Sequence, residues 1–303
     1  MKIAISGGTG FIGKKLTARL TQSGHEVVVI SRKAAEGQGG AANGSATLTW
    51  DQIERDPQAL AGFDGIVNLA GSSLSQRWTD QAKQEMERSR LESTRKLIAG
   101  IRGLDQPPSV FIQASAIGIY GTSETTEFDE NSPPGGQDFP SQLSVKWEAA
   151  ADPIEAMAQT RLVKMRIGLV LGREAGVYPV LKLPYKLMGG GKLGSGRQWM
   201  SWIHIDDLTG LFEFALTQPG VSGPINASAP NAVRQDELGR VIGGVIHRPH
   251  WFPVPAVLMR TVLGEMSLMV TGGQHVIPAA AQQAGFTFTH PYVEEAVRDL
   301  ESK

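Results

Sequence analysis

Three glycines near the start of the chain have the spacing of a turn that binds a dinucleotide. The apolar run 3–5 predicts a buried strand, and an apolar-periodic helix follows Gly7, Gly10 and Gly13. Glycines in this context permit a tight turn, let backbone N–H groups approach a pyrophosphate, and let the helix pack on the strand. The pyrophosphate would then lie at the helix N-terminus. The residues expected to contact the dinucleotide are Gly7, Thr9, Gly10, Phe11, Ile12 and Gly13.

Two cations, Arg32 and Lys33, follow the second predicted strand, and no acidic residue stands there. An acid about 20 residues beyond the glycines would hold the ribose 2′-hydroxyl of NAD, whereas an arginine accommodates the 2′-phosphate of NADP. The sequence therefore favours NADP(H) as the cofactor. The alternative is that both residues are solvated surface cations.

Several further strands end in residues that a bound cofactor would meet, because ligands of open parallel sheets lie outside the carboxyl ends of the strands. The residues expected to face the cofactor are Asn68, Leu69, Ala70, Gly71 and Gly168. Trp50 stands at the end of the third predicted strand. It could flank the adenine, or it could equally be a packed core residue.

Ser115 and Tyr120 follow the strand predicted over residues 109–114. Both carry hydroxyls that could meet a bound carbonyl at the end of a central strand. The alternatives are a serine that hydrogen-bonds local backbone and a tyrosine that packs in the core.

Other candidate residues lie farther along the chain. Arg90, on a charged helix, could reach the cofactor, although a surface ion pair is the favoured alternative. Arg197 could clamp an anionic group of a substrate, and Trp199 could stack on it. His204 lies among apolar neighbours, which favours a structural histidine. Asp206 or Asp207 is expected to cap the helix that follows.

The elements that must position these residues alternate between strand and helix. Apolar runs predict strands over residues 3–5, 26–30, 47–50, 64–71, 109–114, 162–167 and 223–228, with long helices over 79–98 and 141–157. A glycine- and alanine-rich stretch, residues 34–46, predicts a loop. This order is typical of an α/β fold with a doubly wound parallel sheet.

Composition excludes several classes of protein. The chain has 303 residues, a net charge of −1 and no cysteine, so disulfides and thiolate chemistry are excluded and no global field favours nucleic acid or a membrane surface. Its six histidines show no metal-ligand spacing, and no metal is expected. With neither a signal peptide nor an apolar run long enough to span a bilayer, we expect a cytoplasmic protein whose partner is a small-molecule substrate.

Together these motifs resemble the short-chain dehydrogenase/reductase superfamily, in its extended, epimerase-like branch. More narrowly, they are similar to the YfcH-like predicted nucleoside-diphosphate-sugar epimerases. The matching segments are 6–13, 68–71, 77–79, 115–121, 147–148, 194–198, 202–208, 272–274 and 285–286. The resemblance implies a Rossmann domain over residues 1–172, to which 200–228 return, and a smaller, mainly helical substrate domain over 173–303. It also implies a monomer or a homodimer, with the helices that begin near residues 79 and 141 as candidate contacts.

The resemblance also defines where this chain departs from its superfamily. Catalysis in that superfamily uses a tyrosine four residues before a lysine. Lys146 matches the lysine, which would hold the nicotinamide ribose. Gln142 stands where the tyrosine is expected. A carboxamide has no proton to exchange near neutral pH. Ala116 and Met200 replace the usual serine or threonine and the diphosphate-binding arginine. Ser115, Tyr120 and Lys146 are therefore the candidate catalytic residues.

Two hypotheses follow. The first is an atypical NADP(H)-dependent oxidoreductase or epimerase acting on a small polar substrate, with a sugar nucleotide as one candidate. The second is a non-catalytic NADP(H) sensor or scaffold, for example in cell division, because the catalytic tyrosine is replaced by Gln142.

Overall fold

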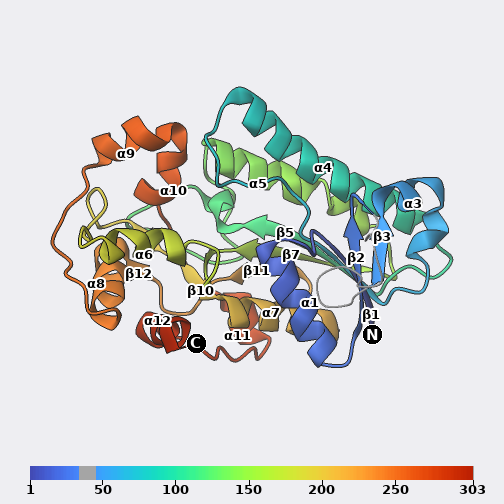
Figure 1. The fold of residues 1–303 in the computed structure, drawn as a ribbon. Helices are drawn as coiled ribbons and strands as arrows, with labels where there is room; N and C mark the ends of the chain where they lie inside the picture. The colour runs from blue at the N-terminus through green and yellow to red at the C-terminus, as the bar shows by residue number, and fades with distance from the viewer. Residues whose placement is uncertain (34–45, 303) are drawn as a thin grey trace.

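A parallel sheet of seven strands forms the centre of the molecule (Figure 1). The computed structural model describes residues 1–33 and 46–302, so most of the predicted loop 34–46 lies outside the described residues. The strand order is β11-β7-β5-β4-β1-β2-β3. The bounds are β1 Lys2–Ser6, β2 Glu26–Ser31, β3 Ala46–Thr49, β4 Gly65–Asn68, β5 Val110–Ala116, β7 Arg161–Ile167 and β11 Gly223–Ala227. The predicted parallel sheet is confirmed, with strand ends displaced by no more than three residues.

Helices cover both faces of this sheet because successive strand residues point to opposite sides. Ile3 and Ile5 pack with α1 (Phe11–Gln22) and α7 (Ile205–Thr217), whereas Ala4 packs with the helices of the other face. Those helices are α3 (Trp50–Arg55) and α4 (Asp80–Arg102), with α5 (Phe139–Ala149) beside α4 (Figure 1). The strand carboxyl ends are thereby left between two helical layers.

The helix predicted over 141–157 begins earlier and ends sooner than expected. The side chain of Asp138 caps α5 by accepting a hydrogen bond from the backbone N–H of Ser141. After Ala149 the chain turns into a short 3₁₀ helix, η3 (Asp152–Ile154). Pro153 has no backbone N–H to donate to the carbonyl four residues earlier, so the α-helix cannot continue to residue 157 as predicted.

The rest of the chain builds a second lobe with a core of its own around Trp202, Tyr178 and Leu238. Its main helices are α6 (Tyr178–Lys186), α8 (Gln235–Val245), α9 (Ala256–Leu263), α10 (Leu268–Thr271) and α12 (Val293–Ser302), whereas α11 (Ala279–Gln283) returns to pack on β11 of the sheet. Two short pairings join it to the first lobe: β8 (Leu169–Leu171) with β10 (Trp202–His204), and β6 (Glu127–Phe128) with β13 (His275–Val276). A third, β9 (Trp199–Met200) with β12 (Val233–Arg234), lies within the second lobe. The C-terminal region is mainly helical, as predicted.

Within the described ranges, 1–33 and 46–302, no helix combines the length and the apolar character needed to cross a bilayer.

Candidate active site

A cavity of about 440 Å³ lies at the carboxyl ends of the central strands. Its wall begins at the glycine turn after β1, continues past the ends of β4, β5 and β7, and is completed by residues 268–274 of the second lobe. Most of the side chains in the wall are apolar. Ligands of doubly wound sheets bind at this edge, so the cavity is the candidate active site.

The glycine turn has the close packing that a pyrophosphate cradle needs. Gly7 has φ +71°, and a Cβ there would lie 2.6 Å from the carbonyl oxygen of Leu69. A Cβ on Gly13 would lie 2.3 Å from the carbonyl oxygen of Gly7, so only glycine lets α1 approach the strand. Gly10 caps α1 and has no side chain to occupy the first backbone N–H groups of that helix. The residues present therefore fit a dinucleotide, whose phosphates would meet the N-terminus of α1.

The predicted adenine side of the site lies outside this cavity. Arg32 and Lys33 are exposed directly after β2. Thr9 is exposed at the turn. Trp50 opens α3 and packs against the core on that face of the sheet, which favours its interpretation as a packed residue.

The strand-end residues divide into two groups. Leu69 and Gly168 line the cavity, as do Gly7, Gly10, Phe11, Ile12 and Gly13. Asn68 does not, because it is fully buried and its side chain is engaged by Ser6, Thr94 and Gln113. The expectation that Asn68 faces the cofactor is wrong for its side chain. Ala70 and Gly71 continue the same turn, where Gly71 leaves room for Arg90.

Ser115 lines the cavity, but Tyr120 does not. The hydroxyl of Ser115 donates to Oε1 of Glu148 at 2.7 Å, and Glu148 in turn accepts two hydrogen bonds from Arg166, at 2.8 and 2.9 Å. The 3₁₀ helix η2 (Ile117–Tyr120) turns the phenol of Tyr120 away, where it accepts from Arg166 and donates to Asn226. Burial raises the pKa of Tyr120, against the opposing effect of Arg166. Tyr120 is therefore not positioned to exchange a proton with a ligand in the cavity.

Helix α5 presents a different face to the cavity from the one that the catalytic motif implies. Lys146 points away and pairs with Glu87 of α4, with 2.8 Å between Nζ and Oε2, and the amide of Gln142 donates to the carbonyl of Gly136. The buried positions of the helix are one residue later, at Leu143 and Trp147, and Trp147 lines the cavity. The predicted role of Lys146 at the nicotinamide ribose is not supported by this position, because Lys146 lies on the exposed face of α5, outside the cavity wall.

Arg90 is buried in the cavity wall, with an exposed fraction of 7%. The surface ion pair favoured from the sequence is wrong, because Arg90 falls on the buried stripe of α4 with Met86, Thr94 and Leu97. Its Nη1 donates to the carbonyls of Ser72 and Met86. Burial lowers the pKa of Arg90 to about 10. The sequence contains the signal for this burial, the i, i+4, i+8 spacing on α4.

The predicted substrate-side residues also divide. Trp199 lines the cavity, stacks on His275 with 4.1 Å between ring centroids, and has the guanidinium of Arg234 over its ring at 3.7 Å. The side chain of Arg197 is 75% exposed and pairs with Glu124 at 3.3 Å, outside the cavity wall. The geometry therefore does not support Arg197 as an anion clamp.

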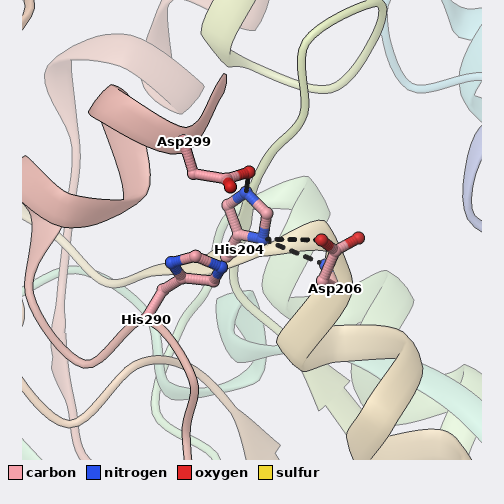
Figure 2. Close-up of side chains that lie close together, drawn as sticks. All are labelled: His204, Asp206, His290 and Asp299. Carbon is pink, nitrogen blue, oxygen red and sulfur yellow. Dashed lines mark hydrogen bonds and ion pairs between the residues drawn. The ribbon is translucent and has the colours of Figure 1, made fainter. Parts of the chain in front are cut away.

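A separate polar cluster surrounds His204 at the start of α7. Figure 2 shows Asp206 and Asp299 on opposite sides of the His204 ring, with His290 beside it; the two histidine ring centroids are 4.1 Å apart. Nδ1 of His204 accepts a hydrogen bond from the backbone N–H of Asp206, so His204 itself caps α7, and the expected cap at Asp206 or Asp207 is wrong. Asp207 instead accepts from the backbone N–H groups of Thr289 and His290.

The chemistry of this cluster is that of a neutral structural histidine. Burial and the neighbouring His290 lower the pKa of His204 to about 4, against the opposing effects of the nearby aspartates. The ligand-forming atoms of His204, Asp206, His290 and Asp299 lie within 4.8 Å of one another, a grouping that no spacing along the sequence reveals. Since Nδ1 of His204 already caps the helix, we interpret the cluster as the contact that holds residues 289–290 and α12 against α7.

The fold and the cavity define a class of protein: a doubly wound α/β domain with a glycine turn for a dinucleotide, completed by a second lobe over the strand ends. The model of the NAD dependent epimerase/dehydratase family matches residues 3–227, so the chain belongs to that family. A domain of unknown function, DUF1731, matches residues 254–300.

Relatives match along nearly the whole chain. The epimerase family protein YfhF of Bacillus subtilis is 42% identical over 301 residues, covering 99% of this chain and 98% of the relative. Human epimerase family protein SDR39U1 is 36% identical over 305 residues, with 99% of each chain covered. A crystal structure of human SDR39U1 with NADPH covers all of both chains with a TM-score of 0.90. A UDP-glucose 4-epimerase of Thermus thermophilus with NAD shares the fold at 16% identity and a TM-score of 0.76.

Proposed function

We propose that this chain is an NADP(H)-dependent enzyme, an atypical reductase or epimerase, that transfers hydride to or from a small polar substrate. The observation that carries the proposal is the continuous cavity from the glycine turn to the second lobe, with Ser115 in its wall. The similarity to human SDR39U1, which was crystallised with NADPH, supports the choice of cofactor. Arg32 and Lys33 would hold the 2′-phosphate, and Gly7 to Gly13 the pyrophosphate.

NADP(H) would supply the hydride, and the chain must supply the path of the proton. Because the Ser115 hydroxyl donates to Glu148, its lone pairs are available to accept a hydrogen bond from a substrate hydroxyl. A proton taken up by Ser115 would be matched by transfer of the serine proton to the carboxylate of Glu148. Reduction would use the same path in reverse. Ser115 thus replaces the absent tyrosine, and Glu148 acts as the positioning residue behind it.

The test combines a substrate screen with one matched pair of variants. A library of small alcohols, carbonyl compounds and sugar nucleotides is screened by NADPH absorbance. Ser115→Ala is expected to lower kcat by roughly 10²- to 10⁴-fold, the usual range for a proton-transfer group, while leaving NADPH affinity unchanged. Ser144→Ala is the control, because Ser144 is a buried serine that donates to the carbonyl of Pro140 and lies outside the cavity wall. Equal rates in both variants would remove Ser115 from the mechanism.

Cofactor choice is tested at Arg32. We expect Arg32→Asp to weaken NADPH binding at least tenfold, because a charge partner is replaced by a repelling charge, and to change NADH binding little. Calorimetric titration of both cofactors measures this. Parent protein that binds NADH as tightly as NADPH would contradict the role of Arg32.

A second function, a non-catalytic NADP(H) sensor or scaffold, is favoured by one observation: the cavity wall holds none of Gln142, Lys146 and Tyr120, the residues at or near the superfamily's catalytic positions. It predicts NADPH binding without turnover of any library member and a protein partner whose affinity changes when NADPH is added. Turnover abolished by Ser115→Ala would exclude it.

A further inference from the structure

A short segment of the second lobe crosses to the first lobe beside the cavity. It consists of the 3₁₀ helix η4 (Gly264–Ser267) and α10 (Leu268–Thr271), and we call it the strap. Leu268 and Met269 of the strap line the cavity together with Ser115 and the glycine turn of the first lobe. The strap therefore supplies part of the wall that would surround a substrate.

The attachment of the strap to the first lobe is shallow. Glu265 forms an ion pair with Lys83 of α4, and the side chain of Glu265 is 63% exposed. Exposed ion pairs contribute little to stability, because water screens them and two long side chains lose freedom. Met266 packs against the small apolar cluster around Trp78, but it is itself only half-buried. Separating these contacts leaves the main cores of both lobes intact.

The two ends of the strap differ in how firmly they are held. At its start, Gly264 has φ +59°, and a Cβ there would meet no atom of the described residues within 4 Å. Glycine serves the backbone angle at this position, and the surroundings leave room for the chain to turn. Toward the other end, the carbonyl of Val270 accepts a hydrogen bond of 2.9 Å from Nε2 of the buried Gln198. Rotation at Gly264 would thus carry residues 265–269 away from α4 while the far end stays in place.

We propose that the strap is a gate of the cavity, which opens at Gly264 to admit the substrate and closes when Glu265 meets Lys83. The proposal rests on the proposed function, since it concerns access to the same cavity. A dinucleotide on the glycine turn would occupy one end of the cavity, and the strand ends form its floor. The strap is held by surface contacts, so it is the part of the remaining wall that can move.

Closure of the strap also completes the site. It returns Leu268 and Met269 to the wall, where their apolar side chains exclude water from the hydride transfer. Lids of this kind move about a few residues that absorb the change in backbone angles, and Gly264 has the freedom for that role.

Opening can be measured directly because the chain has no cysteine. A single thiol is introduced by Met266→Cys, and its rate of reaction with an aromatic disulfide reagent is compared with that of Val257→Cys, at a position on α9 that is 74% exposed. We expect the Met266→Cys thiol to react roughly tenfold more slowly, because it is reached mainly when the strap opens. Adding Glu265→Gln or Lys83→Met should raise the Met266→Cys rate severalfold and leave the Val257→Cys rate unchanged.

A cross-link tests whether opening admits the substrate. The variant Lys83→Cys/Glu265→Cys is joined by a short bismaleimide, which holds the strap on α4. The control is the same variant with each thiol capped by N-ethylmaleimide. For a substrate found in the library screen, we expect turnover to fall roughly tenfold or more in the cross-linked protein relative to the capped one, while NADPH still binds, because a lid that cannot open limits entry and release.

Each outcome decides for or against the gate. A Met266→Cys thiol that reacts as fast as that of Val257→Cys, or whose rate is unchanged by both Glu265→Gln and Lys83→Met, overturns it. Equal turnover of the cross-linked and capped proteins overturns it as well and leaves the proposed function standing. If the parent turns over no library member, the proposed function fails, and the thiol rates still decide whether the strap opens. Leu268→Cys, in the cavity wall, replaces Met266→Cys should the latter fail to fold.

Discussion

Arg90 and Arg166 are both buried arginines at the ends of the central strands, yet their surroundings are opposite. Arg166 forms two hydrogen bonds with Glu148 and one with Tyr120, and its guanidinium lies 5.1 Å from the centre of the Tyr120 ring. Although burial alone would lower its pKa, the hydrogen bonds and charge of Glu148 raise the pKa of Arg166. Arg90 has only carbonyls and an indole face as partners, and burial lowers its pKa.

The difference separates structural groups from groups that await a ligand. A fully satisfied ion pair holds β5, β7 and α5 together and needs nothing from outside. An unsatisfied cation beside a cavity lowers stability unless a ligand completes it, and natural proteins keep such groups mainly at functional sites. Loss of Arg166 should therefore strongly lower the free energy of unfolding, whereas loss of Arg90 should mainly change binding.

The largest effect is expected for Arg166→Met. The substitution leaves Glu148 buried without its partner, and breaking a buried pair from one side costs about 3–5 kcal/mol. Urea denaturation measures the free energy of unfolding. The double variant Arg166→Met/Glu148→Leu should regain most of that loss, because no buried charge remains unpaired. A double variant as unstable as the single one would show that the pair does not act as a unit.

His204 is a third buried ionisable group and extends the comparison of Arg90 with Arg166. It remains neutral although two aspartates lie beside it. Its pKa is about 4 in the folded protein and about 6.5 in an unfolded chain. The unfolded state therefore binds the proton first as the pH falls from 6.5 to 4, and stability declines through that window by about 3 kcal/mol at 1.36 kcal/mol per pKa unit. Above pH 6.5 this contribution is fully present.

The variant His204→Asn tests that contribution, since asparagine can still cap α7 but cannot take up a proton. The free energy of unfolding, followed by urea denaturation from pH 4 to 7, should depend less on pH in this variant. Asp206, Asp207, Asp299 and His290 are further ionisable groups beside His204, so the difference between variant and parent is the quantity to compare. His247→Asn, at an exposed position, is the control. Parallel curves for the parent and His204→Asn would contradict the pKa assigned to His204.

The smallest change in stability is expected for Arg90→Met. The side chain keeps similar length and packing, and no acid loses a partner, so the free energy of unfolding should stay within about 1 kcal/mol of the parent. Urea denaturation beside Arg166→Met gives the direct comparison. A loss of 3 kcal/mol or more would mean that Arg90 is a structural group like Arg166.

Most of the fold could be predicted from the sequence because each sheet strand is a short apolar run between turn residues. The glycine turn was predicted with its context, strand before and helix after. Element ends were less predictable: Asp138 and His204 cap their helices, and these roles depend on side-chain contacts rather than on local pattern. The contact of His204 with His290 and Asp299 could not be predicted from the sequence, because only the tertiary fold brings these residues together.

The parts of the site that are formed by backbone could be predicted from the sequence. The parts that depend on the direction of a side chain were less predictable. Gly7, Gly13 and Gly168, which the sequence predicts to contact the cofactor, line the cavity. Lys146 and Tyr120 do not line it. Consecutive residues of an α-helix point about 100° apart, so Lys146 is exposed where its neighbour Trp147 is buried, and the 3₁₀ turn η2 directs Tyr120 away from the cavity. A signal for the first existed: Leu143 and Trp147 form an apolar i, i+4 pair, which marks the inward face of α5 more directly than the motif spacing does.

The order of the strands has a consequence for any shortened form of this protein. The edge strand β11 pairs with β7, yet residues 168–222 separate the two along the chain and include α7, which covers one face of the sheet. A fragment that stopped at residue 172 would leave β7 as an open edge beside an uncovered apolar layer. Such an edge invites pairing between molecules, so a fragment cut between β8 and α7 should aggregate rather than form an independent nucleotide-binding domain.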